Sequence, residues 1–245
     1  MLKIENTEVV GWEAAIRGMR NPKNSWARSD SFKHTANWEI YRFNEGEPEI
    51  GENDLSLMTN LRNAGTDHRK YMRMIIVYAD IIAPLYWLKE YDTYKVGTVA
   101  NSCSTMHKIA DKEFTIEDFS HEHLWGAFDI NVPESEVDTD CWLENEYGED
   151  ILPFDILTQT IQMLNKARDL YLATKDKKYW WQMIQLLPSS YNQKRTIMLN
   201  YEVLANMYKS RKNHKLDEWH TFCDWIKSLP YSELITGEFE NENNA

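Results

Sequence analysis

An apolar run at Met72–Ile82, MRMIIVYADII, constrains the fold of this chain more than any other segment. Isoleucine and valine at this density, without a polar face, are typical of a strand that is buried on both sides. Ala83-Pro84 follows, and proline suits the first position of a helix, which predicts a helix over Leu85–Tyr91. The longest apolar stretch, within Met74–Trp87, contains Asp80 and is too short to span a bilayer. We therefore expect no membrane partner.

Helical periods occur in the remainder of the chain. A first helix is predicted after a Thr7 cap, with its apolar stripe at Trp12, Ala15, Ile16 and Met19, and a second from Asp54 to Asn63, with Gly65 after its end. A third helix has its stripe at Leu157, Ile161, Leu164, Ala167 and Tyr171. A fourth is predicted from Lys194 to Lys212, and a fifth has its stripe at Trp219, Phe222, Cys223 and Ile226. Lys95–Asn101 is predicted to be a short loop or strand, and Ser25–Gly51 to be mostly irregular. No repeat or linker divides the chain. The sequence therefore predicts one helix-rich α+β domain over residues 1–245, with a small central β-sheet.

The acidic side chains are concentrated in one segment. The chain has 27 Lys+Arg and 39 Asp+Glu, for a net charge of −12. Residues 113–165, here called the acidic segment, contain no Lys or Arg and fourteen Asp or Glu, so the rest has 27 basic against 25 acidic residues, a net charge of +2. Its middle, Asn131–Asp150, lacks a helical or strand period, which predicts a solvated excursion or a docking surface for a basic partner. Overall acidity argues against nucleic-acid binding, but it does not exclude a local site for an anion.

Cysteine usage and the N-terminus indicate a cytoplasmic protein. Cys103, Cys141 and Cys223 form no disulfide framework and match no zinc pattern. The first residues, MLKIENTEVVGWEAA, have neither the basic nor the apolar region of a secretory signal. His121-x-His123 is a possible metal pair, yet nothing at ligand spacing completes a site, so we expect no metal.

Two segments have the composition of a ligand site. Residues 101–108, NSCSTMHK, contain hydroxyl groups, an amide, an imidazole and an ammonium directly after predicted structured elements, where proteins often bind polar ligands. The alternative to a ligand site is a serine-rich turn that caps a helix. In the helix predicted over Lys194–Lys212, Asn200 and Arg211 lie about three turns apart on one face. Arg211 is expected to reach a buried carboxylate or a ligand carbonyl, or else to lie on a solvated rim. Asn206, on another face, needs a different neighbour.

These segments resemble the flavin-dependent thymidylate synthases. Residues 65–72, GTDHRKYM, stand where that family has His-x-Ser-x-x-Glu-His, and residues 82–90, IAPLYWLKE, resemble its apolar xAPxxxxRQ helix. Tyr94–Met106 takes the place of the family signature Arg-His-Arg-x-x-Ser-x-Asn-x-x-Ser-x-Arg. Asn101 and Ser104 match it, while the Arg-His-Arg is replaced and the last Arg becomes Met106.

The C-terminal half matches the family by its spacing. Leu187-Pro188 is followed by Asn200, Asn206 and Arg211 at the family's intervals. Glu202 replaces an arginine there, and Trp181 and Ile184 replace the family's Glu-x-x-Arg. We expect Glu202 to repel the phosphates of a flavin.

The resemblance implies both a reaction and a site. The family transfers a one-carbon unit and a hydride to dUMP, giving dTMP, with FAD as cofactor and NADPH and methylenetetrahydrofolate as co-substrates, and it forms homotetramers. Carried onto this chain, it implies catalytic roles for Arg211 and Ser104, FAD contacts for Asn200, Asn206 and Lys95, and nucleotide contacts for Asn101, Ser104, Glu90 and Arg211. The replaced arginines leave two alternatives open. One is a degenerate homologue that acts as a nucleotide-binding or scaffold protein, and the other is an enzyme on a different or modified nucleotide.

Overall fold

The computed structural model describes residues 2–31, 49–126 and 142–238. The helices are α1 (Trp12–Arg20), α2 (Glu52–Asn63), α3 (Leu85–Tyr91), α4 (Thr105–Lys108), α5 (Pro153–Thr174), α6 (Lys177–Leu186), α7 (Tyr201–Arg211), α8 (Asp217–Lys227) and α9 (Glu233–Thr236). Short 3₁₀ turns are η1 (Asn21–Lys23), η2 (Trp26–Arg28), η3 (Lys70–Met74) and η4 (Ile116–Asp118). No helix in this part of the chain has the length and apolarity that a membrane span needs.

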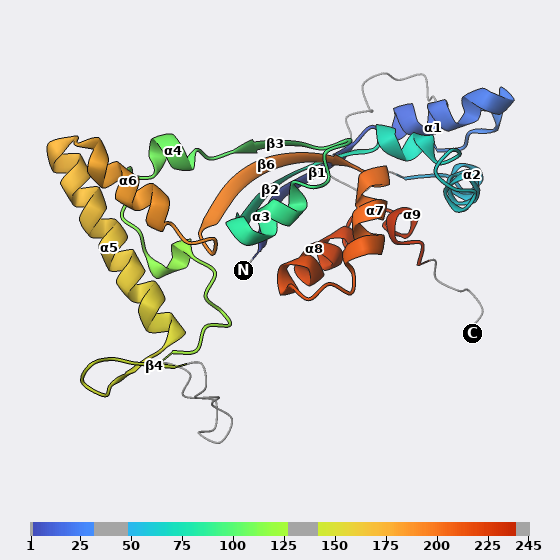
Figure 1. Ribbon diagram of the computed structural model, residues 1–245. Helices are drawn as coiled ribbons and strands as arrows, with labels where there is room; N and C mark the ends of the chain where they lie inside the picture. Colours follow the sequence, from blue (N-terminus) through green and yellow to red (C-terminus); the bar gives the residue numbers. More distant parts are fainter. Residues whose placement is uncertain (1, 32–48, 127–141, 239–245) are drawn as a thin grey trace. The chain divides into compact units, whose positions relative to one another are not determined.

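The strands form one main sheet and a small hairpin (Figure 1). The strands are β1 (Lys3–Val10), β2 (Ile76–Pro84), β3 (Val99–Ser102), β4 (Leu143–Glu144), β5 (Asp150–Ile151) and β6 (Asn192–Asn200). The main sheet has the order β1-β2-β6-β3. The expected mixed α+β class with a small sheet is thus confirmed.

The described residues group into two compact units, each of which we describe by itself. The first unit comprises Ile82–Lys89 and Ser102–Lys194, and the second comprises Leu2–Ile81, Glu90–Asn101 and the chain from Arg195. The expectation of a single domain over residues 1–245 stays a prediction.

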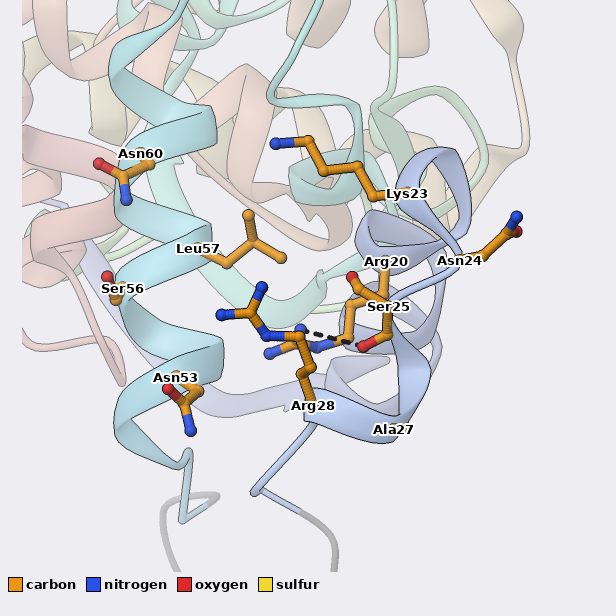
Figure 2. Close-up of a pocket in the computed structure, with 10 residues that line it drawn as sticks. All are labelled: Arg20, Lys23, Asn24, Ser25, Ala27, Arg28, Asn53, Ser56, Leu57 and Asn60. Atoms are coloured by element: carbon orange, nitrogen blue, oxygen red, sulfur yellow. Dashed lines mark hydrogen bonds between the residues drawn. The ribbon is translucent and has the colours of Figure 1, made fainter.

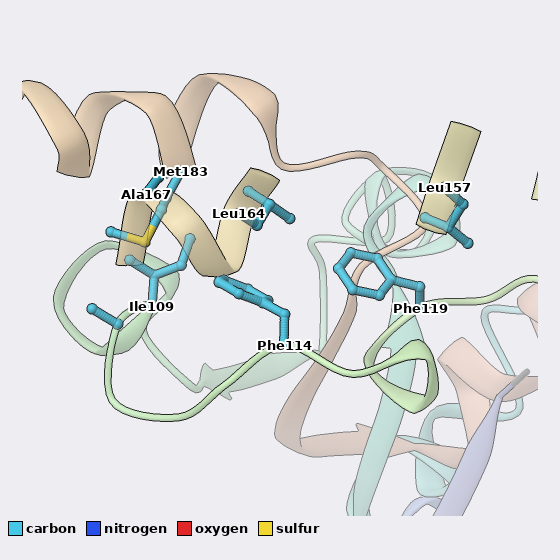
Figure 3. Close-up of a cluster of buried hydrophobic side chains, with 8 residues drawn as sticks. Ile109, Phe114, Phe119, Leu157, Leu164, Ala167 and Met183 are labelled. Carbon is cyan, nitrogen blue, oxygen red and sulfur yellow. The ribbon is translucent and has the colours of Figure 1, made fainter. Parts of the chain in front are cut away.

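The first unit has its own hydrophobic core, whose buried side chains are drawn in Figure 3. α5 and α6 lie side by side in this unit (Figure 1). Phe114, Phe119 and Leu164 are at most 4% exposed there. Two hydrogen bonds, each of 2.8 Å, join the backbone of Phe114 to the side-chain amide of Asn165. The two ends of the acidic segment are therefore joined to each other.

The interior of the acidic segment is partly regular. β4 and β5 pair antiparallel, with Leu143 opposite Ile151, which corrects the expectation that residues 142–150 lack strand structure. Most of the predicted solvated middle, residues 131–141, lies outside the described residues. The hairpin is exposed, as Leu143 at 60% and Tyr147 at 79% demonstrate.

Three element boundaries differ from the sequence-based expectation. Thr7 lies inside β1, not at a helix cap, and its hydroxyl accepts a hydrogen bond from Trp225 Nε1; Gly11 immediately precedes α1. The predicted strand over Met72–Ile82 begins at Ile76, because residues 70–74 form the turn η3. Pro84 ends that strand, and α3 begins one residue later.

The predicted helix over Lys194–Lys212 is wrong in its first part. Residues 192–200 form β6, and only Tyr201–Arg211 is helical. Ile197 and Leu199 are buried on alternate positions, as in a strand, and β6 lies between β2 and β3. Ile197 and Tyr201 are four residues apart, which is also the spacing of neighbours on one face of a helix, so the sequence pattern extended the predicted helix into the strand.

Candidate functional site

Arg211 is the centre of a polar cluster in the second unit. It is the last residue of α7, and its Nη1 lies 2.8 Å from Oε2 of Glu90, near the end of α3. Its Nε donates to the hydroxyl of Tyr94 at 3.0 Å. Glu90 Oε2 also accepts a hydrogen bond from Trp219 Nε1 at 3.0 Å and lies 3.3 Å from His214 Nε2. We call Glu90, Tyr94, Arg211, His214 and Trp219 the Arg211 cluster.

Aromatic rings flank the guanidinium of Arg211. Its central carbon lies 4.8 Å from the ring centroid of Trp219 and 5.6 Å from that of Tyr94, within the range of cation–π attraction. The Arg211 side chain is 19% exposed. Nε and Nη1 are bonded within the cluster, while Nη2 has no hydrogen-bond partner among the described residues. Arg211 therefore has a fixed orientation and keeps donors for an outside acceptor.

A second ion pair in this unit joins Arg69 to Glu202. Arg69 Nε lies 3.0 Å from Glu202 Oε2, with the side chains 14% and 9% exposed. Arg69 Nη2 also donates to Asn206 Oδ1 at 3.2 Å, which confirms that Asn206 and Asn200 have different neighbours. The expected repulsion between Glu202 and a flavin phosphate needs correction, because Arg69 neutralises that carboxylate at short range.

Asn200 is the N-cap of α7. Its Oδ1 accepts a hydrogen bond from the backbone N–H of Val203 at 2.9 Å, and its Nδ2 lies 3.5 Å from the carbonyl oxygen of Gly97. Gly97 has a φ of +78°, and a Cβ built there would lie 2.5 Å from Asn200 Nδ2. Asn200 and Arg211 therefore both contact the segment Glu90–Gly97, although Asn200 is not part of the helix.

The remaining predicted site residues have fewer contacts. Lys95 and Asn101 are exposed, the former in the turn before β3 and the latter within β3. Ser104 belongs to the first unit, where it caps α4 by accepting a hydrogen bond from the N–H of His107 at 3.1 Å. The structure thus has the capping turn that the sequence left as an alternative for this segment.

Sequence reasoning missed three members of the cluster. Tyr94 lies in the segment where this chain lacks the family's Arg-His-Arg, and Trp219 was predicted only to face the core from its helix. His214 lies in the loop before α8. Arg69 was likewise not recognised as the partner of Glu202. No local pattern marks these side chains, because their partners are more than a hundred residues away in the sequence.

The histidines and cysteines of the described residues bear on whether this chain has a metal site or a reactive thiol. No group of three or more His, Cys, Asp or Glu side chains there can hold a metal. His121 Nδ1 lies 2.9 Å from the carbonyl oxygen of Phe119. Burial raises the pKa of Cys223 to about 11, so its thiol is protonated at neutral pH. Cys103 is exposed and free, and Cys141 lies outside the described residues.

Comparisons with known proteins identify the fold. No family model and no curated protein matches the sequence. The structure is similar to thymidylate synthase X from Helicobacter pylori, solved with FAD and dUMP, at a TM-score of 0.62 and 14% identity, over 97% of this chain and 98% of that one. A second flavin-dependent thymidylate synthase structure from H. pylori, complexed with FAD and dUMP, gives the same TM-score and identity over 96% and 98% of the two chains.

A third similar structure has a different name. The UMP/dUMP methylase PolB from Streptomyces cacaoi, bound with 5-Br dUMP, has a TM-score of 0.55 and 12% identity, over 97% of this chain and 95% of that one. At these identities the likeness establishes the fold. This chain has the fold of the flavin-dependent thymidylate synthases, and the resemblance noted in the sequence is confirmed at that level.

Proposed function

We propose that this chain is a flavin-dependent enzyme that transfers a one-carbon unit and a hydride to a uracil nucleotide, converting dUMP to dTMP. The observation that carries the proposal is the Arg211 cluster, in which a guanidinium is fixed by Glu90 and Tyr94 and keeps Nη2 available. The similarity to structures named for their FAD and dUMP supports the same substrate and cofactor.

Arg211 acts on the pyrimidine in this proposal. A guanidinium donates hydrogen bonds to a uracil carbonyl and stabilises negative charge that develops on it. Glu90 and Tyr94 restrain the side chain before the nucleotide binds, so little rotamer entropy is lost on binding. Glu90 therefore acts through Arg211, as a positioning residue, rather than through direct contact with the nucleotide.

The three residues that the resemblance assigns to FAD differ in how many hydrogen-bonding groups they have available for it. Asn200 is 8% exposed, and its amide accepts the capping hydrogen bond and contacts Gly97, which leaves one N–H donor of a nearly buried side chain for a flavin. Asn206 is exposed with its Nδ2 free among the described residues, and Lys95 is exposed with no acidic partner there. An amide and an ammonium are donors that suit ribose and phosphate oxygens, so Asn206 and Lys95 would bind the cofactor. When bound, FAD supplies the redox chemistry, with NADPH and methylenetetrahydrofolate as co-substrates.

Ser104 and Asn101 would contact the nucleotide phosphate. The Ser104 oxygen accepts the capping hydrogen bond, which leaves its O–H as a donor. Asn101 offers an exposed side-chain amide. Lys108 is paired with Asp111 at 2.9 Å, so it compensates less for the missing family arginines than a free cation would. Assembly as a homotetramer remains a prediction from the resemblance, and a cytoplasmic location remains a prediction from cysteine usage and the N-terminal sequence.

A second candidate is a nucleotide-binding protein that has lost the chemistry. Two observations favour it: the carboxylate of Glu90 already neutralises Arg211, and Glu202 occupies the place of a family arginine. An enzyme on another uracil nucleotide is the third candidate, and the similarity to a UMP/dUMP methylase favours that one.

Calorimetric titration separates these candidates. FAD and dUMP are titrated separately and then together into the wild type, Arg211→Ala and Lys209→Ala, the last of which removes an exposed cation from the same helix. We expect both ligands to bind the wild type and Lys209→Ala, and dUMP affinity to fall at least about tenfold in Arg211→Ala. A wild-type protein that stays colourless after incubation with FAD would refute the flavin proposal.

Growth of a thymidine-requiring cell tests the reaction itself. Rescue by the wild-type gene and by Lys209→Ala, with loss in Arg211→Ala, would support dTMP formation. Binding of dUMP without rescue, together with turnover of UMP in vitro, would favour the third candidate. Binding without any turnover would favour the second.

A further inference from the structure

A cationic pocket lies in the second unit, on residues that the Arg211 cluster does not use (Figure 2). The pocket encloses about 560 Å³ between α2 and the turn that follows α1. Three cationic side chains line it, Arg20, Lys23 and Arg28, and none of its lining residues is acidic. Clefts of a few hundred Å³ are of the size that binds small molecules.

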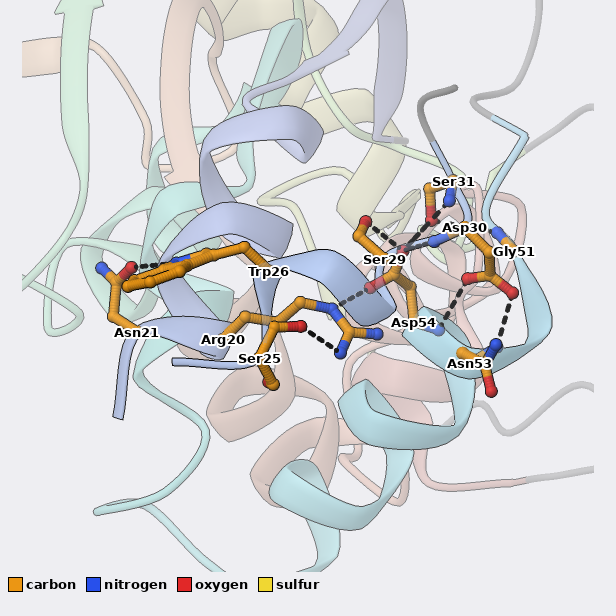
Figure 4. Close-up of polar contacts among 10 residues, drawn as sticks. All are labelled: Arg20, Asn21, Ser25, Trp26, Ser29, Asp30, Ser31, Gly51, Asn53 and Asp54. Atoms are coloured by element: carbon orange, nitrogen blue, oxygen red, sulfur yellow. Dashed lines mark hydrogen bonds and ion pairs between the residues drawn. The ribbon is translucent and has the colours of Figure 1, made fainter. Parts of the chain in front are cut away.

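The charges around the pocket do not cancel within the described residues. Arg20 Nε lies 2.6 Å from Asp54 Oδ1, so that buried pair is neutral (Figure 4). Lys23 and Arg28 are exposed, and their side chains have no ion-pair or hydrogen-bond partner among the described residues. Two like charges at one opening repel each other, and an anion between them relieves this repulsion.

Arg20 adds a fixed donor with no acceptor. Its Nε is bound to Asp54, and its Nη1 donates to the carbonyl oxygen of Ser25 at 3.2 Å, so the guanidinium cannot rotate freely. Its Nη2 is buried and has no hydrogen-bond partner among the described residues. A buried N–H group without an acceptor costs about 1–3 kcal/mol, so Arg20 gains an acceptor if an oxyanion in the pocket displaces the atoms that cover Nη2.

The rest of the lining is polar and neutral. Amide side chains come from both sides of the pocket, and Ser56 adds a hydroxyl, so the pocket can bond to hydroxyl groups of a ligand. The N-terminus of α2 does not contribute, because the Asp30 carboxylate already accepts hydrogen bonds from the backbone of Asn53 and Asp54. The anion must therefore be bound by side chains.

We propose that this pocket binds the phosphate group of a small, hydroxyl-bearing phosphomonoester. Arg28 and Lys23 bind its charge, and Arg20 Nη2 donates to one of its oxygens once the atoms that cover Nη2 move aside. A dianionic phosphate matches two unpaired cations, and a guanidinium donates to it through two parallel N–H groups. The proposal does not depend on the flavin chemistry, since it uses none of the same residues.

The test follows the side-chain Nε–H signals of arginine by NMR in the full-length protein. Ribose 5-phosphate is the probe, with ribose and inorganic phosphate as separate arms. Ribose 5-phosphate lacks a pyrimidine, so failure of the proposed thymidylate chemistry does not affect the result. We expect saturable shifts of the Arg20 and Arg28 signals, weaker binding of inorganic phosphate, and no response to ribose.

Substitutions then assign the binding to this pocket. Arg28→Gln and Lys23→Gln should each weaken ribose 5-phosphate binding about tenfold, because each removes one charge-assisted contact from an exposed side chain. Arg17→Gln is the matched control, since Arg17 is an exposed cation on α1 that does not line the pocket. Equal affinity in all three variants would overturn the proposal. So would shifts confined to Arg211, or no saturation at millimolar ligand in the wild type.

Discussion

Arg69 and Glu202 form an ion pair of 3.0 Å across 133 residues of sequence, and both side chains are mostly buried. The pair explains how α7 tolerates a buried carboxylate in its first turn. It also joins η3 and its preceding turn to α7, since Arg69 is the residue immediately before η3.

Removing one partner of this pair should be costly. Arg69→Ala leaves Glu202 buried without its cation, so we expect the free energy of unfolding to fall by about 3–5 kcal/mol in urea titrations. Lys227→Ala, which breaks an exposed pair with Asp224, should cost at most about 1 kcal/mol. Equal effects of the two substitutions would contradict this account of Glu202.

The indole of Trp219 should matter for nucleotide binding. Trp219→Phe keeps a ring beside Arg211 but removes the hydrogen bond to Glu90, which is worth about 1–3 kcal/mol of stability. If Glu90 positions Arg211, the dissociation constant for dUMP should rise as well. Trp225→Phe, on the same helix, also loses an indole hydrogen bond, here to Thr7, and should leave dUMP binding unchanged. A calorimetric titration in which both variants bind dUMP equally would count against a positioning role.

Gly97 should tolerate no side chain. Gly97→Ala places a methyl group 2.5 Å from the Asn200 amide at a φ of +78°, so it combines a steric clash with backbone strain. Gly65→Ala is the matched control, because Gly65 has a φ of +102° but no atom within 4 Å of the added carbon. We expect Gly97→Ala to lower the melting temperature more than Gly65→Ala. The reverse order would mean that Asn200 can move away.

The ionisation of Asp54 should make the free energy of unfolding depend on pH in the acid range. Burial raises its pKa, but hydrogen bonds from Ser31, Ser29 and Arg20 outweigh this effect and lower it from 3.8 to about 2. Since the folded pKa is the lower one, the ionised group stabilises the fold above about pH 4, and this contribution is lost as the pH falls towards about 2. The shift corresponds to about 2 kcal/mol.

Urea titrations at several acid pH values measure this loss. Ser31→Ala removes a hydrogen bond to the carboxylate and should bring the folded pKa closer to the unfolded one, which makes the loss smaller. Ser56→Ala, at an exposed position of the same helix α2, is the control and should leave the pH profile unchanged. A wild-type profile that is flat over this range would show that Asp54 is not the group responsible.

The sequence predicted some elements well because their periods are local. The stripes of α1, α5 and α8 repeat every three to four residues, so each helix could be located without knowing its neighbours. β2 was recognised because most of its residues are apolar, although it contains Asp80 and only alternate residues such as Val77, Ala79 and Ile81 are fully buried, which differs from the expected burial on both sides. β1 was missed, since at the end of the strand order it has a largely polar, exposed sequence.

The candidate site was predictable only in part. Residue types and spacing left a carboxylate, a ligand carbonyl or a solvated rim open for Arg211, and the structure identifies a carboxylate, that of Glu90, as its partner. Spacing did not reveal that Asn200 serves as a helix cap, because residues 194–200 were assigned to the helix. A strand and a helix differ by the partners that their backbones find, and β6 finds its partners in β2 and β3.

By itself, the sequence determined the mixed class of the fold, the separation of the acidic segment from a near-neutral remainder, and the resemblance that named Arg211. These properties follow from local periods, composition and motif spacing. Only the tertiary structure decided that Arg69 neutralises Glu202, that Glu90 and Trp219 fix Arg211, and that Arg20 and Arg28 line one pocket. The physical reason is that charge pairing and desolvation depend on distance in space, and residues more than a hundred positions apart meet only when the chain is folded.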